Sequence, residues 1–153
     1  MSELTLRVAT SADCRFYWEV NNAPSTRALS ISSEPIPWDD HTEWFESRLR
    51  GSETVLYVAE LKGQRVGVVR FDVTTNEATI SVAIAEFHRG RGLGRRVIAE
   101  GTRTTLATGD VAHVIALIRP DNIGSVRAFK AAGYVRDSET RVGDIELLRY
   151  VAR

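Results

Sequence analysis

The sequence predicts an α/β protein with a mixed, mostly antiparallel sheet and helices on both faces of that sheet. Segments rich in Val, Ile, Phe and Tyr follow one another over residues 54–84, and their short polar connections are typical of antiparallel strands. Beyond them, segments with a helical spacing of apolar residues alternate with strand-like segments, which favours a mixed sheet. At 153 residues the chain is long enough for one core and short for two, so we expect a single domain over 1–153.

The first fifty residues predict a strand and two helices joined by a loop. Residues 4–8 alternate between apolar and polar side chains, and the residues after them offer caps for a helix over about 10–22. A Ser- and Pro-rich loop is expected over 24–37. Either Asp39 or Asp40 then caps a second helix.

The rest of the chain alternates between predicted strands and helices. In chain order these are strands over 54–61, 65–73 and 78–84, a helix over 92–106, a strand over 112–118, a helix from Asn122 to Gly133, and strands over 135–140 and 144–152. The strand over 112–118 is continuously apolar, which indicates a central position in the sheet.

The composition excludes several classes of protein. Lys+Arg and Asp+Glu each number 20, so the formal net charge is zero, which argues against a broad basic surface for nucleic acid. The single cysteine, Cys14, excludes an intrachain disulfide, and three scattered histidines make no metal site. No apolar run is long enough to span a bilayer and no signal peptide is evident, so we expect a cytoplasmic protein with no membrane partner.

The most informative segment joins the predicted strand over 78–84 to the predicted helix over 92–106. It is rich in glycine and arginine: Arg89, Gly90, Arg91, Gly92, Gly94, Arg95 and Arg96. Glycines let the backbone turn tightly and approach a ligand, and amide groups converge at the N-terminus of the helix that follows. We therefore expect an anion site here, for a phosphate or pyrophosphate. A basic turn without a ligand is the alternative.

The spacing of these glycines does not match the two common nucleotide-binding motifs. Gly90-x-Gly92-x-Gly94 differs from Gly-x-Gly-x-x-Gly, and it follows antiparallel strands rather than the first strand of a βαβ unit. No Gly-Lys-Ser/Thr closes a phosphate-binding loop. Both nucleotide-binding interpretations therefore lack the structural context that they need.

Two spaced motifs resemble those of the GNAT family of N-acetyltransferases. Arg89-x-x-Gly92-x-Gly94 after a strand is similar to the family signature Arg/Gln-x-x-Gly-x-Gly/Ala. Residues 122–134 read Asn-x-x-Ser-x-x-x-Phe-x-x-x-Gly-Tyr, which is similar to the family's Asn-x-x-Ser/Ala-x-x-x-Tyr/Phe-x-x-x-Gly-Phe/Tyr helix. The order of elements agrees with the family over nearly the whole chain. The resemblance implies the GNAT fold and direct transfer of acetyl from acetyl-CoA to a primary amine.

The resemblance also implies where acetyl-CoA binds. Residues of the turn would hold its pyrophosphate through their amides: Arg89, Gly90, Arg91, Gly92, Leu93, Gly94 and Arg95. The end of the fourth strand, Val82, Ala83 and Ile84, would pair with the pantetheine amides as an added strand does. The N–H near Ile84 would face the thioester carbonyl and stabilise the oxyanion. Asn122 would contact the pantetheine, cap its helix, or do both.

One residue departs from the commonest family pattern. Many relatives carry a tyrosine that protonates the departing thiolate, and this chain has Phe129, which has no proton to give. In some relatives a serine of this motif is proposed for that role, so the resemblance makes Ser125, about one helical turn earlier, the candidate proton donor. The alternatives are that its hydroxyl bonds the backbone one turn earlier, or that the thiolate leaves without an acid.

The general base is not evident from the sequence. Ser81 on the fourth strand could relay a proton through water, or it could simply face the neighbouring strand. Glu60, Asp72 and His41 are candidates only by residue type. Cys14 lies far in sequence from the expected thioester site, so no covalent acyl-enzyme is expected and packing is its expected role.

The acceptor side is expected within residues 18–45, which hold all three tryptophans. Arg27, Trp38, His41 and Trp44 would line a pocket for a flat or ring-shaped acceptor. Packing of the tryptophans on the sheet is the alternative.

Residues 18–45 also resemble one branch of the family. Trp-x-x-x-Asn-x-Pro-x-x-Arg over 18–27 and Ser33-Glu-Pro-Ile-Pro-Trp38 are similar to enzymes that acetylate a nucleotide-linked 4-amino sugar in pseudaminic acid synthesis. Enzymes that acetylate the N-terminus of ribosomal proteins share much of this pattern and are the runner-up. A non-catalytic CoA-binding module and an ATP-dependent enzyme are the other classes considered. The oligomeric state, monomer or homodimer, stays open.

Overall fold

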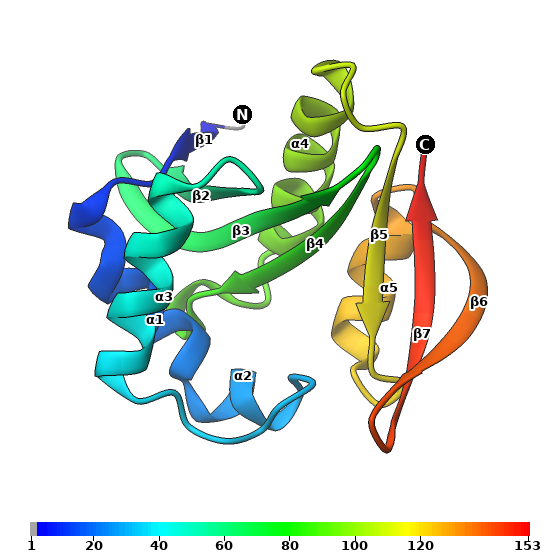
Figure 1. Cartoon of the computed structure of the whole chain (residues 1–153), viewed down its shortest axis with the longest axis horizontal. Helices are drawn as coiled ribbons and strands as arrows, with labels where there is room; N and C mark the ends of the chain where they lie inside the picture. Colours follow the sequence, from blue (N-terminus) through cyan, green and yellow to red (C-terminus); the bar gives the residue numbers. More distant parts are fainter. Residues whose placement is uncertain (1–2) are drawn as a thin grey trace.

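The computed structural model describes residues 3–153, whose strands form one mixed sheet (Figure 1). The strands are β1 (Leu4–Val8), β2 (Thr54–Leu61), β3 (Gln64–Thr74), β4 (Glu77–Ile84), β5 (His113–Ile118), β6 (Val135–Val142) and β7 (Ile145–Ala152). Their order in the sheet is β1-β2-β3-β4-β5-β7-β6. Neighbouring strands run antiparallel except β4 and β5, which run parallel. The predicted mixed, mostly antiparallel sheet is confirmed, with β5 inside it.

Helices cover both faces of this sheet, as the sequence predicts (Figure 1). They are α1 (Cys14–Asn22), α2 (Pro24–Ala28), α3 (Trp38–Arg50), α4 (Leu93–Ala107) and α5 (Ile123–Ala131). α1 and α3 pack on one face, where Tyr17, Val20 and Phe45 form a cluster with buried side chains of β2, β3 and β4. We call this the α1/α3 face.

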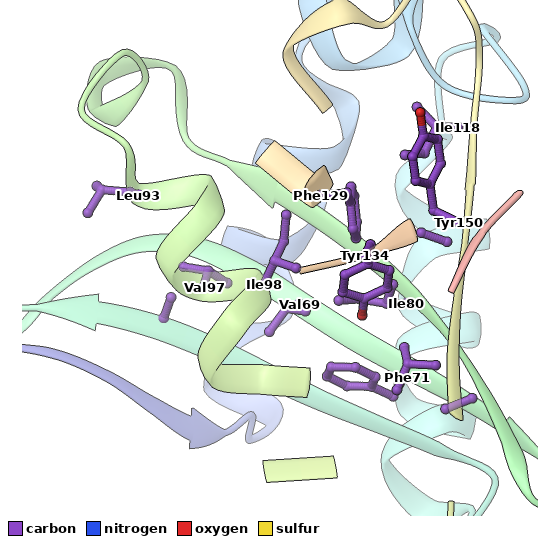
Figure 2. Close-up of a cluster of buried hydrophobic side chains, with 14 of the residues drawn as sticks. Val69, Phe71, Ile80, Leu93, Val97, Ile98, Ile118, Phe129, Tyr134 and Tyr150 are labelled. Atoms are coloured by element: carbon purple, nitrogen blue, oxygen red, sulfur yellow. The ribbon is translucent and has the colours of Figure 1, made fainter. Parts of the chain in front are cut away.

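The larger cluster of buried side chains lies on the opposite face, which we call the α4/α5 face. Val97 and Ile98 of α4 and Phe129 of α5 join Val69 and Phe71 of β3 in this cluster (Figure 2). Burying one such side chain contributes roughly 1.5–3 kcal/mol. Packing of this kind is the main reason why an amphipathic segment such as α4 is helical in the folded chain.

The entry into α1 is fixed by a buried carboxylate. Asp13 is 1% exposed, and its side chain accepts hydrogen bonds from the backbone N–H of Thr10 and from both terminal nitrogens of Arg7. Thr10 accepts in return from the backbone N–H of Ala12. The capping residues predicted over 10–13 are therefore present, with a short 3-10 turn over Ser11–Asp13 ahead of the α-helix.

Two boundaries in the first fifty residues differ from the prediction. The expected loop over 24–37 contains the short helix α2, which starts at Pro24 because the fixed φ of proline suits a first helical position. Helix α3 begins at Trp38, so Asp39 and Asp40 lie in its first turn and neither caps it. Carboxylates at that place still interact favourably with the positive end of the helix dipole.

Candidate active site

The sheet splits between β4 and β5. The parallel pairing covers only residues 77–79 of β4 and 113–115 of β5. Beyond it, β4 stays paired with β3 as far as Ile84, and β5 stays paired with β7 as far as Ile118. Figure 1 shows the two strands close together at one end and diverging toward α2. Two unpaired strand edges therefore face each other across a gap in the sheet.

The edge of β4 presents backbone groups to this split. The N–H of Ala85 donates to the carbonyl oxygen of Val66 over 2.9 Å. Because bonded and non-bonded pairs alternate along an antiparallel ladder, the N–H and C=O groups of Val82 and Ile84 point away from β3. The carbonyl oxygen of Ile84 accepts from Nε of Arg89 over 3.0 Å. Because of the alternation along the ladder, the N–H of Ile84 points into the split.

A cleft with a volume of about 830 Å³ occupies the split, within the size range of ligand pockets. Its walls come from α1, α2, β3, β4, β5 and α5 and from the turn before α4. Its lining is rich in arginine: Arg27, Arg70, Arg89, Arg95, Arg119 and Arg127. Among residues 3–153, no aspartate or glutamate lines it. The charge of the cleft therefore favours anionic ligands.

The cleft is lined from both faces of the sheet. Ile80, Val82 and Ile84 pack with the cluster on the α4/α5 face, whereas Ala83 packs with the cluster on the α1/α3 face. Since side chains alternate along a strand, Ser81 lies on the α1/α3 face with Ala83. Two molecules could thus enter from opposite faces and meet at the end of β4.

The glycine-rich turn has the geometry of an anion site. Gly90 and Gly92 adopt φ values of 78° and 74°, which residues with a side chain rarely adopt, and the space beside each is open. Helix α4 starts at Leu93 with neither a capping side chain nor an acidic residue in its first turn. The first amides of α4 consequently have no acceptor inside the helix. Arg95 lines the cleft, whereas Arg91 is exposed outside it.

Arg89 links the turn to α2. Besides its bond to the carbonyl oxygen of Ile84, its terminal nitrogens donate to Ser25 Oγ over 2.6 Å and to Thr26 Oγ1 over 2.8 Å. Ser25 Oγ donates in turn to Glu86 over 2.8 Å. Arg89, predicted to hold the pyrophosphate, lines the cleft, and its guanidinium joins the end of β4 to the start of α2.

The start of α5 brings Asn122, Ser125 and Phe129 to the cleft. Asn122 Oδ1 accepts from the backbone N–H of Ser125 over 3.2 Å, so it caps the helix. Within residues 3–153, the Ser125 hydroxyl makes no hydrogen bond, and the bond to the preceding turn that we considered is not formed. Phe129 packs edge-to-face on Tyr134, whose hydroxyl bonds Thr102 Oγ1 over 2.6 Å. Burial raises the pKa of Tyr134 to about 12, and this phenol does not line the cleft.

His41 does not reach the cleft. It is 3% exposed, and its Nε2 donates to the carbonyl oxygen of Cys14 over 2.8 Å. Burial lowers the pKa of His41, which keeps the ring neutral, and the ring lies between Trp38 and Phe45. Helix α3 packs the rings of Trp38, His41 and Phe45 toward α1. His41, which was expected to contact an acceptor, is therefore part of the core.

The two tryptophans of the predicted pocket also lie outside the cleft lining. Trp38 packs edge-on against Trp18 at 5.1 Å between ring centres and is 40% exposed. The ring of Trp44 lies under the guanidinium of Arg70, 5.1 Å away. Of the four residues expected to bind the acceptor, only Arg27 lines the cleft, and the predicted aromatic pocket is not formed.

The general-base candidates are held elsewhere. Glu60 pairs with Arg7 at 2.8 Å, and Asp72 accepts from Thr54 over 2.9 Å and from Arg70 over 3.2 Å. Neither carboxylate lines the cleft. Within residues 3–153, no cluster of three or more His, Cys, Asp or Glu side chains is arranged to hold a metal ion.

The cleft residues that were not predicted from the sequence include Arg70, His88 and Arg119. Arg70 could have been found from its register, since a hairpin between 65–73 and 78–84 places it opposite Ser81. His88 precedes the glycine-rich turn, and its Nδ1 is buried without a hydrogen-bond partner. No local signal marks Arg119, because its role depends on how β5 approaches α2.

Comparison with known proteins gives one family and several relatives. The family described as "Acetyltransferase (GNAT) domain" matches residues 3–135. The L-amino acid N-acyltransferase MnaT of Escherichia coli (strain K12) is 28% identical over 86% of this chain and 80% of its own length. The L-methionine sulfoximine/L-methionine sulfone acetyltransferase of Salmonella typhimurium is 27% identical, again over 86% of this chain and 80% of its own.

A solved structure shares the fold. Spermidine N-acetyltransferase from Vibrio cholerae, in complex with CoA and spermine, superposes with a TM-score of 0.86 at 18% identity. The match covers 98% of this chain and 95% of that one. At that identity the likeness shows the fold alone. Within residues 3–153, none of the helices is long and apolar enough to cross a bilayer.

Proposed function

We propose, from the premise that this chain belongs to the GNAT acetyltransferase family, that it transfers the acetyl group of acetyl-CoA to the primary amine of a small molecule. The cleft that connects the α4 N-terminus to the split between β4 and β5 carries this proposal. It joins an anion site on the α4/α5 face to a second opening on the α1/α3 face. We take residues 1–153 as one catalytic domain.

On the donor side, backbone groups provide most of the binding. The first amides of α4 would hold the pyrophosphate, with Arg95 beside them, and Asn122 would contact the pantetheine. The backbone groups of Val82 and Ile84 that point into the split would pair with the pantetheine amides. Bound acetyl-CoA would supply the activated acetyl group. The N–H of Ile84 would stabilise negative charge on the acetyl oxygen.

In this proposal, hydroxyl groups and water carry out the two proton transfers, one to the departing thiolate and one from the amine. Ser125 lines the cleft with an unbonded hydroxyl, so we propose it as the donor to the departing thiolate. No carboxylate of residues 3–153 lines the cleft. Tyr17 is not an alternative base, because burial raises its pKa and its hydroxyl bonds the carbonyl oxygen of Tyr57 over 2.7 Å. We propose that Ser81 passes the proton of the amine to water.

The proposed acceptor is a nucleotide-linked 4-amino sugar, on the strength of the sequence pattern over 18–45. An amino acid is the second candidate, because the two curated relatives compared above are named for amino acids and for methionine derivatives. A peptide N-terminus is the third.

Thiol release from acetyl-CoA tests this function. The protein would be mixed with acetyl-CoA and, in turn, a UDP-linked 4-amino sugar, L-methionine sulfone, a ribosomal-protein N-terminal peptide and spermidine. We expect amine-dependent release of CoA with one of the first two. Ser125→Ala should slow turnover roughly 100-fold, the lower end of the range for a lost acid catalyst.

A matched variant separates direct transfer from an acyl-enzyme. Cys14 lies outside the cleft lining, and burial raises the pKa of its thiol. Cys14→Ala should therefore keep turnover within about a factor of two. Tight acetyl-CoA binding by calorimetry without thiol release for any amine would instead identify a non-catalytic CoA-binding module.

A further inference from the structure

Two arginines reach the cleft from the α1/α3 face, away from the turn at α4. Arg70 comes from β3 and stands opposite Ser81 in the β3–β4 ladder, and Arg27 comes from α2. Ile84 lies three residues beyond Ser81, which is roughly 10 Å along the strand. A small molecule can therefore touch these guanidinium groups while its amine lies near the end of β4.

The side chain of Arg70 is fixed by contacts with Trp44 and Asp72. Its guanidinium stacks on Trp44 at 5.1 Å and its Nε donates to Asp72 over 3.2 Å. Asp72 is itself held by the hydroxyl of Thr54. A cation fixed by a ring and a carboxylate loses little freedom when it binds a ligand. Trp44, expected to touch the acceptor, would thus act by positioning Arg70.

Arg27 lacks a counter-ion. One of its terminal nitrogens donates to the carbonyl oxygen of Glu34 over 3.2 Å, and its Nε is buried without a hydrogen-bond partner. It makes no ion pair with a carboxylate of residues 3–153. Burial, and the nearby positive charge of Arg70, lower the pKa of Arg27. A partly buried cation next to another cation is unfavourable until an anion joins them.

The geometry points to Arg27 and Arg70 as a subsite for a carboxylate or phosphate group of the acceptor, so that the amine acetylated here belongs to an anionic molecule. This inference rests on the proposed function. The anion is distinct from the pyrophosphate of acetyl-CoA, for which the α4 N-terminus on the opposite face is available. A polyamine would find no carboxylate among the described residues that line the cleft.

Matched pairs of acceptors test whether the negative charge of the acceptor, rather than its shape, determines kcat/KM. One pair is L-methionine sulfone and its carboxamide, and the other is the UDP-linked 4-amino sugar and the same amino sugar without UDP. We expect the anionic member of one pair to have a kcat/KM at least about tenfold above its neutral partner. The pair that shows the difference identifies carboxylate or phosphate as the group bound. Equal values within both pairs, or spermidine as the best acceptor, would overturn the inference.

Arginine variants then test whether the anionic group of the acceptor binds at Arg27 and Arg70. Arg27→Gln and Arg70→Gln should each lower kcat/KM for the preferred anionic acceptor roughly 10–100-fold, the value of a charged hydrogen bond. The same variants should change kcat/KM for the neutral partner less than about threefold, and Arg27→Lys should recover part of the loss. Arg15→Gln, an exposed arginine on α1 that pairs with Glu19, is the control and should match the unmodified protein. Equal losses for both members of a pair would contradict the subsite.

A binding measurement that needs no turnover separates the proposed acetyltransferase function from the proposed subsite at Arg27 and Arg70. L-methionine sulfone and UDP would be titrated by calorimetry into the protein saturated with CoA. If no amine releases thiol, the proposed function fails, and the titration still decides the subsite. Saturable binding of one probe, weakened about tenfold or more by Arg27→Gln with unchanged CoA affinity, supports it. Absence of binding by both probes overturns it.

Discussion

Gly67 on β3 lies opposite Ile84, at the place where the proposed chemistry occurs. A Cβ at this position would lie 2.9 Å from the carbonyl oxygen of Ala83 and 2.9 Å from Cδ1 of Ile84. Backbone and side chain at the end of β4 therefore occupy the space that any other residue would need. The position of the Ile84 amide depends on a residue that the motifs do not include.

We predict that Gly67→Ala damages activity more than stability. The added methyl group must displace the end of β4, at a cost of about 1–3 kcal/mol in the free energy of unfolding. A shift of about 1 Å in the Ile84 amide should lower kcat on the order of a hundredfold. Urea unfolding and steady-state thiol release measure the two effects.

Gly51→Ala is the matched control for that substitution. A Cβ on Gly51 meets only ordinary contacts, the nearest at 3.5 Å, and its φ of −81° suits alanine. Its kcat should equal that of the unmodified protein. An unchanged kcat in Gly67→Ala would show that the end of β4 does not position the reacting group.

At the scale of elements, the short helix α2 bridges the two sides of the split. Arg89 binds Ser25 and Thr26 from the β4 side. Arg119 donates to the carbonyl oxygens of Ala28 and Ser30, over 3.3 Å each, from the β5 side. A five-residue helix is too short to be stable alone, so these arginines hold it in place.

We predict that Arg119→Ala loosens this bridge. Losing two hydrogen bonds from a charged donor should make the amides of residues 26–33 exchange with solvent roughly tenfold faster, the factor expected for about 1.4 kcal/mol. Hydrogen exchange read by mass spectrometry measures it, with α4 as an internal reference. Arg136→Ala, on edge strand β6, should leave residues 26–33 unchanged. Equal exchange in both variants would mean that α2 is held by other contacts.

At the scale of the whole molecule, the sheet separates two clusters of buried side chains, and the cleft runs between them. The α1/α3 cluster surrounds a neutral histidine, His41, whose pKa is lowered by burial and only partly restored by its bond to the carbonyl of Cys14. This makes the stability of the fold dependent on pH. At a pH above about 6.5, the pKa of histidine in an unfolded chain, the ring is neutral in both states.

We predict that the free energy of unfolding falls as the pH drops from 7 to 5. Below about 6.5 the unfolded chain binds a proton at His41 while the folded chain does not, so about 1.4 kcal/mol is lost per pH unit until the folded-state pKa is reached. Urea unfolding at a series of pH values measures the decline. It should be smaller in His41→Phe. The same decline in His41→Phe would assign it to other groups.

Local chemistry explains which features were predictable. The helix, strand and turn signals predicted the fold class, the mixed sheet and the helices on both faces, because periodicity and glycine placement act over a few residues. The family was identified from the resemblance of two motifs to those of known proteins. The turn before α4 was located from Gly90, Gly92 and Gly94, the arginines around them, and the strand and helix that flank them. Helix α2 was missed because its formation depends on Arg89 and Arg119, which are distant in sequence. Trp38, His41 and Trp44 were misplaced because aromatic residues serve cores and pockets equally well.

The sequence by itself determined most of the elements, the resemblance to the family and the position of the glycine-rich turn, since each depends on residues that are close in sequence. Tertiary structure decided where the cleft lies and which side chains line it. The split between β4 and β5 and the meeting of Arg27 with Arg70 follow from how strands and α2 pack, with side chains far apart in sequence. The fold buries His41, which lowers its pKa and makes a candidate base part of the core, and it leaves Nε of Arg27 buried without a hydrogen-bond partner.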